Sequence, residues 1–287
     1  MTTPILDIER ARFNMIEQQI RPWEVLDQSV LDLLATVKRE EFVPPAYRNL
    51  AFVDMEVPLN LGGEETGEFM LAPKVEARVL QSLALRPDDL VLEIGSGSGY
   101  MAALLGAKAR EVTTVESNPK LQAFAQHNLQ RNGFSNVQVQ GGDGARGWNT
   151  NQAYDVIVIS GGLPFLPDSF LQQLKPHGRL VAFVGAGSVM NAVLVTRTGD
   201  KSFDTITLFE TRVAYLHNAE PVSRFRFCHH GKSEPRPTGR LAGTKAPPTC
   251  VAGCARALGV GIVPYRKFFA YPHGSSAFTS ERDGTRC

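Results

Sequence analysis

Three glycines at alternate positions, Gly95, Gly97 and Gly99, give this chain its clearest chemical signal. An apolar run at residues 90–94 precedes them and a helical pattern at 99–107 follows, which predicts a loop between a strand and a helix. Glycine has no side chain, so its backbone can approach a ligand closely and adopt positive φ. We therefore expect a small-molecule site at the carboxyl end of this strand.

Two other glycine-rich motifs fit the loop poorly. A P-loop requires Gly-Lys-Ser or Gly-Lys-Thr, whereas Gly99 is followed by Tyr100 and Met101. The dinucleotide fingerprint has glycine or alanine at its sixth position, where helix and strand pack closely, and here that position is Tyr100. The P-loop is therefore excluded, and binding of NAD or FAD is disfavoured.

The spacing of Glu93, Gly95, Gly97 and Gly99 instead resembles the first motif of class I methyltransferases, whose cofactor is S-adenosylmethionine. Glu116 ends the second expected strand, 17 residues after Gly99. A carboxylate at that place can accept hydrogen bonds from both ribose hydroxyls. The alternative for Glu116 is a solvated acid at a strand end.

A second acid, Asp143, lies in a glycine-rich turn after the third expected strand. It can accept a hydrogen bond from the adenine amino group, and the small residues after it leave room for the ring. An ordinary Asp-Gly turn is the alternative. We expect no metal, and we expect the cofactor to contact Glu93, Gly95, Ser96, Gly97, Gly99, Glu116, Ser117, Asp143, Gly144, Ala145 and Ser160.

The elements that must position these residues follow a regular strand–helix alternation from residue 90 onward. Apolar runs predict strands at 90–94, 111–116, 137–140, 154–160, 179–184, 192–197 and 205–215. Helical patterns lie at 5–20, 28–37, 74–85, 99–107, 119–132 and 167–174. Alternation of this kind predicts an α/β Rossmann-like domain with a seven-stranded, mostly parallel sheet and helices on both faces. The first helices form an N-terminal extension, and the last two strands an antiparallel hairpin at one edge.

A longer stretch points to one family. The segment from Leu34 to Arg48, with Arg-Glu-Glu-Phe-Val-Pro-Pro at 39–45, resembles that of protein-L-isoaspartate O-methyltransferases. The cofactor motifs at 91–100 and 142–144 are similar to that family's, and the likeness runs from about residue 12 to 217. It implies transfer of a methyl group from S-adenosylmethionine to a carboxylate of isoaspartyl protein or peptide.

The chain departs from this family on the substrate side. The family's Gly-x-Thr-x-Ser-x-Pro signature, anchored on Pro73, has Phe69 and Leu71 where the hydroxyl residues belong. Thr66 is the nearest hydroxyl and a weak catalytic candidate, because its use requires a shifted register. No other catalytic residue is assigned. The preceding loop is also acidic, with glutamates at 64, 65 and 68, and would repel a carboxylate.

This departure leaves two alternatives open: methylation of another substrate, such as a small molecule, and a non-catalytic cofactor-binding protein. A nucleic-acid substrate is not expected. The fourth strand ends in Ser-Gly-Gly-Leu-Pro rather than the Asn/Asp-Pro-Pro-aromatic motif of base methyltransferases, and residues 1–227 carry a net charge of −5.

The composition changes abruptly after Phe227. All four cysteines lie in residues 228–287, which carry a net charge of +6, whereas the whole chain has +1. We therefore expect a methyltransferase domain at 1–227, divided into a helical and substrate-side segment at 1–85 and a core at 86–227. A basic, disordered tail would follow at 228–287. No apolar run could span a membrane, and the N-terminus does not resemble a signal peptide, so a cytoplasmic location is expected. We also expect a monomer.

Overall fold

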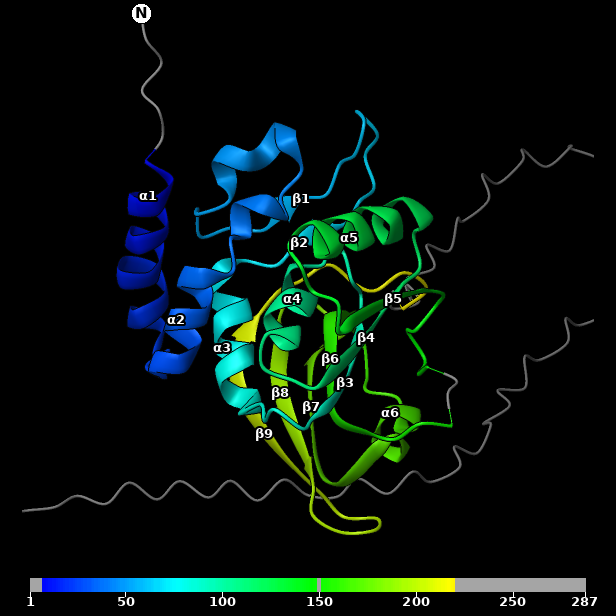
Figure 1. The fold of residues 1–287 in the computed structure, drawn as a ribbon. Coiled ribbons are helices and arrows are strands. Elements are labelled where there is room, and N and C mark those ends of the chain that lie inside the picture. Colours follow the sequence, from blue (N-terminus) through cyan, green and yellow to red (C-terminus); the bar gives the residue numbers. More distant parts are fainter. Residues whose placement is uncertain (1–6, 149–150, 220–287) are drawn as a thin grey trace, which may run out of the picture. The chain divides into compact units, whose positions relative to one another are not determined.

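The computed structural model describes residues 7–148 and 151–219. Their centre is a seven-stranded sheet in the order β5-β4-β3-β6-β7-β8-β9 (Figure 1). The sequence predicted each of these strands near its observed place. Their bounds are β3 (Leu90–Ile94), β4 (Glu111–Glu116), β5 (Val137–Gly141), β6 (Tyr154–Leu163), β7 (Leu174–Val184), β8 (Met190–Arg197) and β9 (Phe203–Thr211).

The pairing of the strands confirms the predicted mostly parallel sheet. From β5 to β7 every pair is parallel, and β8 and β9 add antiparallel strands at one edge. The residue Ile94 at the end of β3 pairs with Val115 on one side and Ile159 on the other. Because the chain continues from β3 to β4 on one side and reaches β6 on the other, the end of β3 is a topological switch point. Ligands bind at such points in open α/β sheets.

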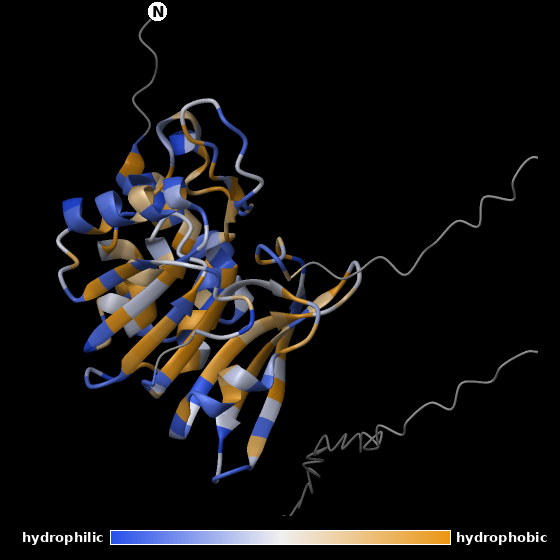
Figure 2. Ribbon diagram, turned by 90° about the vertical axis from the view of Figure 1, so that its right-hand side faces the viewer, coloured by the Kyte–Doolittle hydropathy of each residue, from blue (hydrophilic) through white to orange (hydrophobic). Residues whose placement is uncertain are grey.

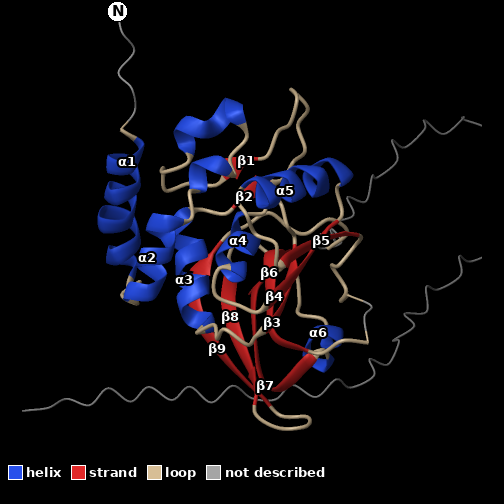
Figure 3. Cartoon of the chain, viewed as in Figure 1, coloured by secondary structure: helices blue, strands red, loops and turns tan. Residues whose placement is uncertain are grey.

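Helices cover both faces of the sheet, as predicted (Figures 1 and 3). Side chains of a strand alternate between the two faces of the sheet. Val91 and Val156 therefore pack with the helices on one face, and Leu92 and Ile157 pack on the opposite face. Figure 2 shows the hydrophobic residues concentrated along the strands. The helices on the face of Val91 are α3 (Pro73–Leu83), α4 (Tyr100–Gly106) and α5 (Pro119–Arg131). The face of Leu92 has α6 (Asp168–Gln172).

The N-terminal extension is helical but less regular than predicted. The expected helix at 5–20 is α1 (Ile8–Met15), which begins at its cap Asp7 and continues as a π-helical turn over Ile16–Ile20. Short 3₁₀ turns then alternate with α2 (Gln28–Thr36), which is capped by the side chain of Asp27. A small two-stranded sheet, β1 (Val57–Pro58) and β2 (Phe69–Met70), follows before α3.

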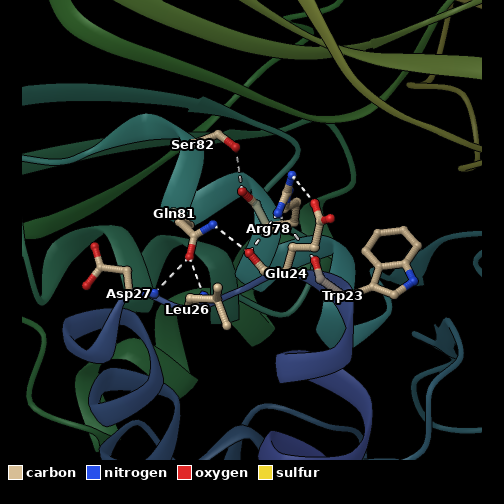
Figure 4. Close-up of polar contacts among 7 residues, drawn as sticks. All are labelled: Trp23, Glu24, Leu26, Asp27, Arg78, Gln81 and Ser82. Carbon is tan, nitrogen blue, oxygen red and sulfur yellow. Dashed lines mark hydrogen bonds and ion pairs between the residues drawn. The ribbon is translucent and has the colours of Figure 1, made fainter. Parts of the chain in front are cut away.

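One polar cluster fixes the turn between α1 and α2 onto α3 (Figure 4). The amide oxygen of Gln81 accepts hydrogen bonds from the backbone N–H groups of Leu26 and Asp27, at 2.8 and 2.9 Å. The Gln81 amide nitrogen donates to the carbonyl of Glu24, which also accepts from Arg78. Glu24 has a left-handed backbone with φ of 61°, and these bonds hold it there.

Within the described residues no helix is long and apolar enough to cross a membrane. The predicted tail at 228–287 and the boundary before it lie outside the described residues.

Candidate functional site

The glycine loop joins β3 to α4 and has the backbone that its sequence predicted. Gly95, Gly97 and Gly99 all have positive φ, at 93°, 51° and 84°. They do not share one role, however. A Cβ on Gly99 would lie 3.2 Å from the carbonyl oxygen of Ala125, so this glycine lets α4 approach α5. Gly95 and Gly97 line a cavity at the end of β3, where a Cβ would lie 3.2 Å from Leu216 Cδ2 and 3.1 Å from Leu59 Cδ1, respectively.

Two adjoining cavities lie at this switch point. Both are lined by Glu68, Gly95, Glu116 and Leu216. The first adds predicted residues Gly97 and Ser160, and the second adds Ser117, Asp143, Gly144 and Ala145. The fold therefore gathers eight predicted cofactor-binding residues around one elongated space, whereas Glu93, Ser96 and Gly99 line neither cavity.

Glu116 is held in place by the glycine loop itself. Its side chain accepts hydrogen bonds from the backbone N–H of Gly97 and of Asn118, each at 2.9 Å. Each carboxylate oxygen retains a second lone pair for another donor. A ribose offers two adjacent hydroxyl donors, so this oriented carboxylate fits the sugar of a nucleoside cofactor.

Glu93 lies behind the cavity and positions a residue that lines it. Its carboxyl group is fully buried and accepts hydrogen bonds from Thr114 Oγ1 at 2.7 Å and from Ser160 Oγ at 2.9 Å. Ser96 Oγ lies 2.7 Å from the same threonine hydroxyl, which extends the network. Burial raises the pKa of Glu93 to about 8, although the two hydroxyl hydrogen bonds oppose this shift.

Asp143 forms a local turn at the second cavity. Its Oδ1 accepts from the backbone N–H of Ala145 at 2.9 Å and its Oδ2 from the Asn218 amide at 3.0 Å. The hydrogen bond from Ala145, and then that from Asn218, lower the pKa of Asp143, so it is a carboxylate near neutral pH. A Cβ on Gly144 would lie 2.8 Å from Ile94 Cδ1, so this position must be glycine for the turn to pack on β3.

The sequence did not predict the strap that covers the cavities, residues 213–218. It placed residues 213–215 at the end of the last strand, at 205–215, whereas β9 ends at Thr211. This strap pairs with the end of β6, where the N–H of Gly162 donates to Ala214 and the N–H of Leu216 donates back to Gly162. A Cβ on Gly161 would lie 2.6 Å from Leu216 Cδ2. Glycines inside a strand often mark such a close approach, so the pair at 161–162 was the available signal.

The opposite wall comes from residues 56–71, where the family signature is altered. Leu59, Phe69 and Leu71 line the first cavity with the acids Glu56 and Glu68. The weak catalytic candidate Thr66 lines neither cavity, because its hydroxyl donates to the Leu59 carbonyl at 3.1 Å and accepts from the Glu68 N–H. It stabilises the loop in this structure.

A buried arginine anchors this wall to the rest of the domain. Arg39 donates to the carbonyls of Ala51 and Leu71, at 2.8 and 2.6 Å, and forms an ion pair with Glu76 of α3. Its guanidinium also lies 5.0 Å from the centroid of the Tyr100 ring. The Arg-Glu-Glu-Phe-Val segment therefore orders the cavity without lining it.

In the described part of the chain no cluster of histidine, cysteine, aspartate and glutamate side chains could hold a metal ion. The available chemistry is therefore that of a site with fixed carboxylates, glycine backbone and an opposite wall that has both apolar and acidic side chains.

Comparison with known proteins agrees with this geometry. Residues 10–220 match the sequence family described as protein-L-isoaspartate(D-aspartate) O-methyltransferase. The chain is 40% identical over 232 residues to a protein-L-isoaspartate O-methyltransferase of Rhodopseudomonas palustris, a match that covers 80% of this chain and 100% of the relative. It is 38% identical over 190 residues to one of Koribacter versatilis, covering 66% of this chain and 82% of that protein.

Two solved structures have a similar fold. A protein-L-isoaspartate O-methyltransferase is similar with a TM-score of 0.62 and 25% identity, over 74% of this chain and 67% of that one. A Plasmodium falciparum protein described as a putative member, solved with S-adenosyl-L-homocysteine, shares the fold with a TM-score of 0.58 at 17% identity. That match covers 72% of this chain and 97% of the other.

Proposed function

Because the chain belongs to the protein-L-isoaspartate(D-aspartate) O-methyltransferase family, we propose that it methylates the free carboxylate of isoaspartyl residues in damaged protein. It is a methyltransferase that uses S-adenosylmethionine. The observation that carries the proposal is the cavity at the end of β3, where Gly95, Gly97 and Glu116 meet a wall built by residues 56–71. A protein or peptide substrate would enter along that wall.

The residues around the two cavities have separate roles in this proposal. Glu116 would bind the ribose hydroxyls, and Asp143 with Gly144 and Ala145 would bind the adenine. Gly95 and Gly97 would leave space for the methionine part, and Ser160 would be held by Glu93 beside it. Ser96 and Gly99 would act indirectly, through the hydroxyl network and through the packing of α4. The bound cofactor would supply an electrophilic methyl group on a sulfonium.

The chain has little acid–base work to do in this reaction. A carboxylate acceptor has an ordinary pKa near 4, so it is already ionised at neutral pH and needs no general base. What the protein must supply is alignment of the acceptor oxygen with the methyl group, which contributes roughly 7–11 kcal/mol in well-oriented reactions. No residue is therefore proposed as a catalytic acid or base.

A small-molecule acceptor is the second candidate. The observation that favours it is the replacement of the signature hydroxyls by Phe69 and Leu71, which line the first cavity with apolar surface.

The methyltransferase domain is proposed to comprise residues 1–227, with the tail outside it, and to act as a cytoplasmic monomer.

The test is transfer of radiolabelled methyl groups to a short isoaspartyl peptide, with the same peptide containing ordinary aspartate as control. We expect label only on the isoaspartyl peptide, and we expect alkali to release it as methanol, because a methyl ester is base-labile. Calorimetry with S-adenosylmethionine accompanies the assay. Tight cofactor binding without peptide methylation would reject the isoaspartyl substrate and favour the small molecule.

A further inference from the structure

The last strand of the sheet, β9, has an unpaired outer edge. Among the described strands it pairs with β8 alone, and its outer side makes no backbone hydrogen bond to another described residue. Proteins often protect such an edge with lysine or proline, but β9 has the sequence Phe-Asp-Thr-Ile-Thr-Leu-Phe-Glu-Thr and contains neither. An extended segment of another chain can therefore add to this edge through main-chain hydrogen bonds.

A β-bulge gathers apolar side chains on one face of β9. Leu208 is an extra residue between Thr207 and Phe209, both of which pair with β8. The bulge interrupts the alternation of side chains, and Leu208 and Phe209 both pack on the same face of the sheet as α3. Ile206 pairs with Leu194, which packs on that face, and Ile206 is 56% exposed. We call Ile206, Leu208 and Phe209 the edge strip.

The edge strip ends in a slot of about 250 Å³, which is lined by Pro22, Trp23, Glu24, Arg78, Leu208 and Phe209. The rings of Trp23 and Phe209 meet edge to face, with their centroids 5.2 Å apart. Figure 4 shows the Trp23 ring pointing away from the polar cluster that holds its turn on α3. In that cluster Arg78 donates to the carbonyls of Trp23 and Glu24, at 3.3 and 2.7 Å. The slot is therefore built by fixed elements and has room for one aromatic side chain.

The charged residues of β9 are both acidic. Asp204 lies on the face of the edge strip, because it precedes Ile206 by two residues in the regular part of the strand. Glu210 follows the bulge. Both are exposed, and neither forms an ion pair with another described residue. A second copy of β9 would bring more carboxylates to this edge, so charge complementarity favours a partner that carries a basic residue.

We propose that the edge of β9 binds an extended segment of another protein in which a basic, an apolar and an aromatic residue follow one another at every second position. The segment adds to the sheet as a further strand. Because residues two apart lie on one face of a strand, the basic residue lies beside Asp204, the apolar residue beside Ile206 and the aromatic residue in the slot. No residue of β9 lines either cofactor cavity, so this inference does not depend on the proposed function.

The experiment is isothermal titration calorimetry of the full chain with the capped peptide Ser-Lys-Thr-Val-Thr-Phe-Ser. A second peptide has glutamate in place of lysine, and a third has serine in place of phenylalanine. At low ionic strength we expect the lysine peptide to bind about tenfold more tightly than the glutamate peptide. This difference should shrink near 1 M salt, where the screening length falls to about 3 Å. The peptide without phenylalanine should bind several-fold more weakly, because it leaves the slot empty.

Three variants assign the binding to β9. Asp204→Lys should reverse the preference, so that the glutamate peptide binds more tightly than the lysine peptide. Ile206→Ser should weaken the binding of both peptides several-fold. Val189→Ser is the matched control, because Val189 is an apolar residue of similar exposure, 54%, that lies outside the edge strip and the slot. Calorimetry with S-adenosylmethionine should give the wild-type affinity in all three variants, which shows that the domain is folded.

The results that overturn the proposal are distinct. Equal affinity for the lysine and glutamate peptides, or an Asp204→Lys variant that keeps the wild-type preference, removes the charge recognition. A peptide that binds only after the chain is shortened to end at Phe227 would assign the edge to this chain's own C-terminal residues. A dimer in sedimentation that Ile206→Ser dissociates would assign it to a second copy. Either of the last two results rejects a separate partner.

Discussion

At the scale of single residues, Glu116 makes the most direct contact with the proposed cofactor. Its carboxylate is oriented by the N–H groups of Gly97 and Asn118 before any ligand arrives. Hydrogen bonds to a charged group contribute about 1.5–3 kcal/mol, so Glu116→Ala should weaken S-adenosylmethionine binding roughly ten- to a hundredfold. Isothermal titration calorimetry measures this change.

The matched control is Glu111→Ala at the start of the same strand. Glu111 accepts a hydrogen bond from Gln138 at 3.1 Å and lines neither cavity, so its loss should leave the affinity unchanged. Wild-type affinity in the Glu116 variant would show that the ribose lies elsewhere.

The raised pKa of Glu93 predicts that the protein loses stability as pH rises. Its pKa is raised by burial from an ordinary 4.5 to about 8 in the folded protein. Between these values the folded state binds a proton that the unfolded state lacks, so the contribution of Glu93 to stability falls as pH rises. The slope for one such group is about 1.4 kcal/mol per pH unit, and it levels off above the folded pKa.

The variant Glu93→Gln removes the titrating group and keeps the shape. Urea unfolding at intervals from pH 5 to 8 should therefore show a shallower loss of stability with pH in this variant than in wild type. Glu111→Gln, at the half-buried start of the neighbouring strand, should retain the wild-type slope. Parallel curves for wild type and the Glu93 variant would mean that this carboxyl group is ionised in the folded protein.

At the scale of elements, the cluster in Figure 4 explains how the N-terminal extension is held on α3. Gln81 makes hydrogen bonds to three backbone groups of the turn at 24–27. A net contribution of about 0.5–1.5 kcal/mol each, reduced by solvent, predicts that Gln81→Ala lowers the unfolding free energy by about 1–2 kcal/mol. The melting temperature should fall by roughly 2–8 °C.

Gln28→Ala provides the comparison, since it makes the same substitution on another helix. The Gln28 side chain donates a hydrogen bond to Asp32 on an exposed helical face, so calorimetric melting should be nearly unchanged. Equal melting temperatures for the two variants would show that the turn does not depend on the Gln81 amide.

The sheet was predictable from sequence because its strands are short apolar runs separated by turns. β3 and β4 were predicted to the residue, since both are buried on two faces and bounded by polar residues. The prediction missed the start of β7 at Leu174, because Leu174 already pairs with Tyr154 while residues 175–178 form an irregularity before Arg179 pairs with Val156. It also missed the π-helical turn at 16–20, because that turn keeps the hydrophobic spacing of an α-helix.

The site was predictable only where it follows from the sheet. Gly95, Gly97 and Glu116 come together because β3 and β4 are parallel neighbours. Gly99 lines neither cavity, because the space beside it is filled by α5, a contact between segments distant in sequence. The strap at 213–218 was missed for the same reason: its position depends on tertiary pairing with β6 rather than on a local pattern.

At the scale of the whole molecule, the two cavities are assembled from segments distant in sequence, among them 56–71, 95–97, 116–117, 143–145, 160–161 and 213–217. Forming the two cavities therefore requires the folded domain up to the strap. Among the described residues, none beyond the strap lines either cavity. The family match ends at residue 220, and the change in charge and cysteine content follows soon after.

Truncation tests this boundary at two points. A chain that stops after Phe227 keeps the strap, so its melting temperature and its affinity for S-adenosylmethionine should equal those of the full chain. A chain that stops after Thr211 keeps every strand of the sheet but loses Leu216 between the cavities and Asn218 on Asp143. It should lose most cofactor affinity, because the open cavity admits water and releases the carboxylate of Asp143. A marked loss of melting temperature after the first truncation would instead place residues 228–287 within the folded domain.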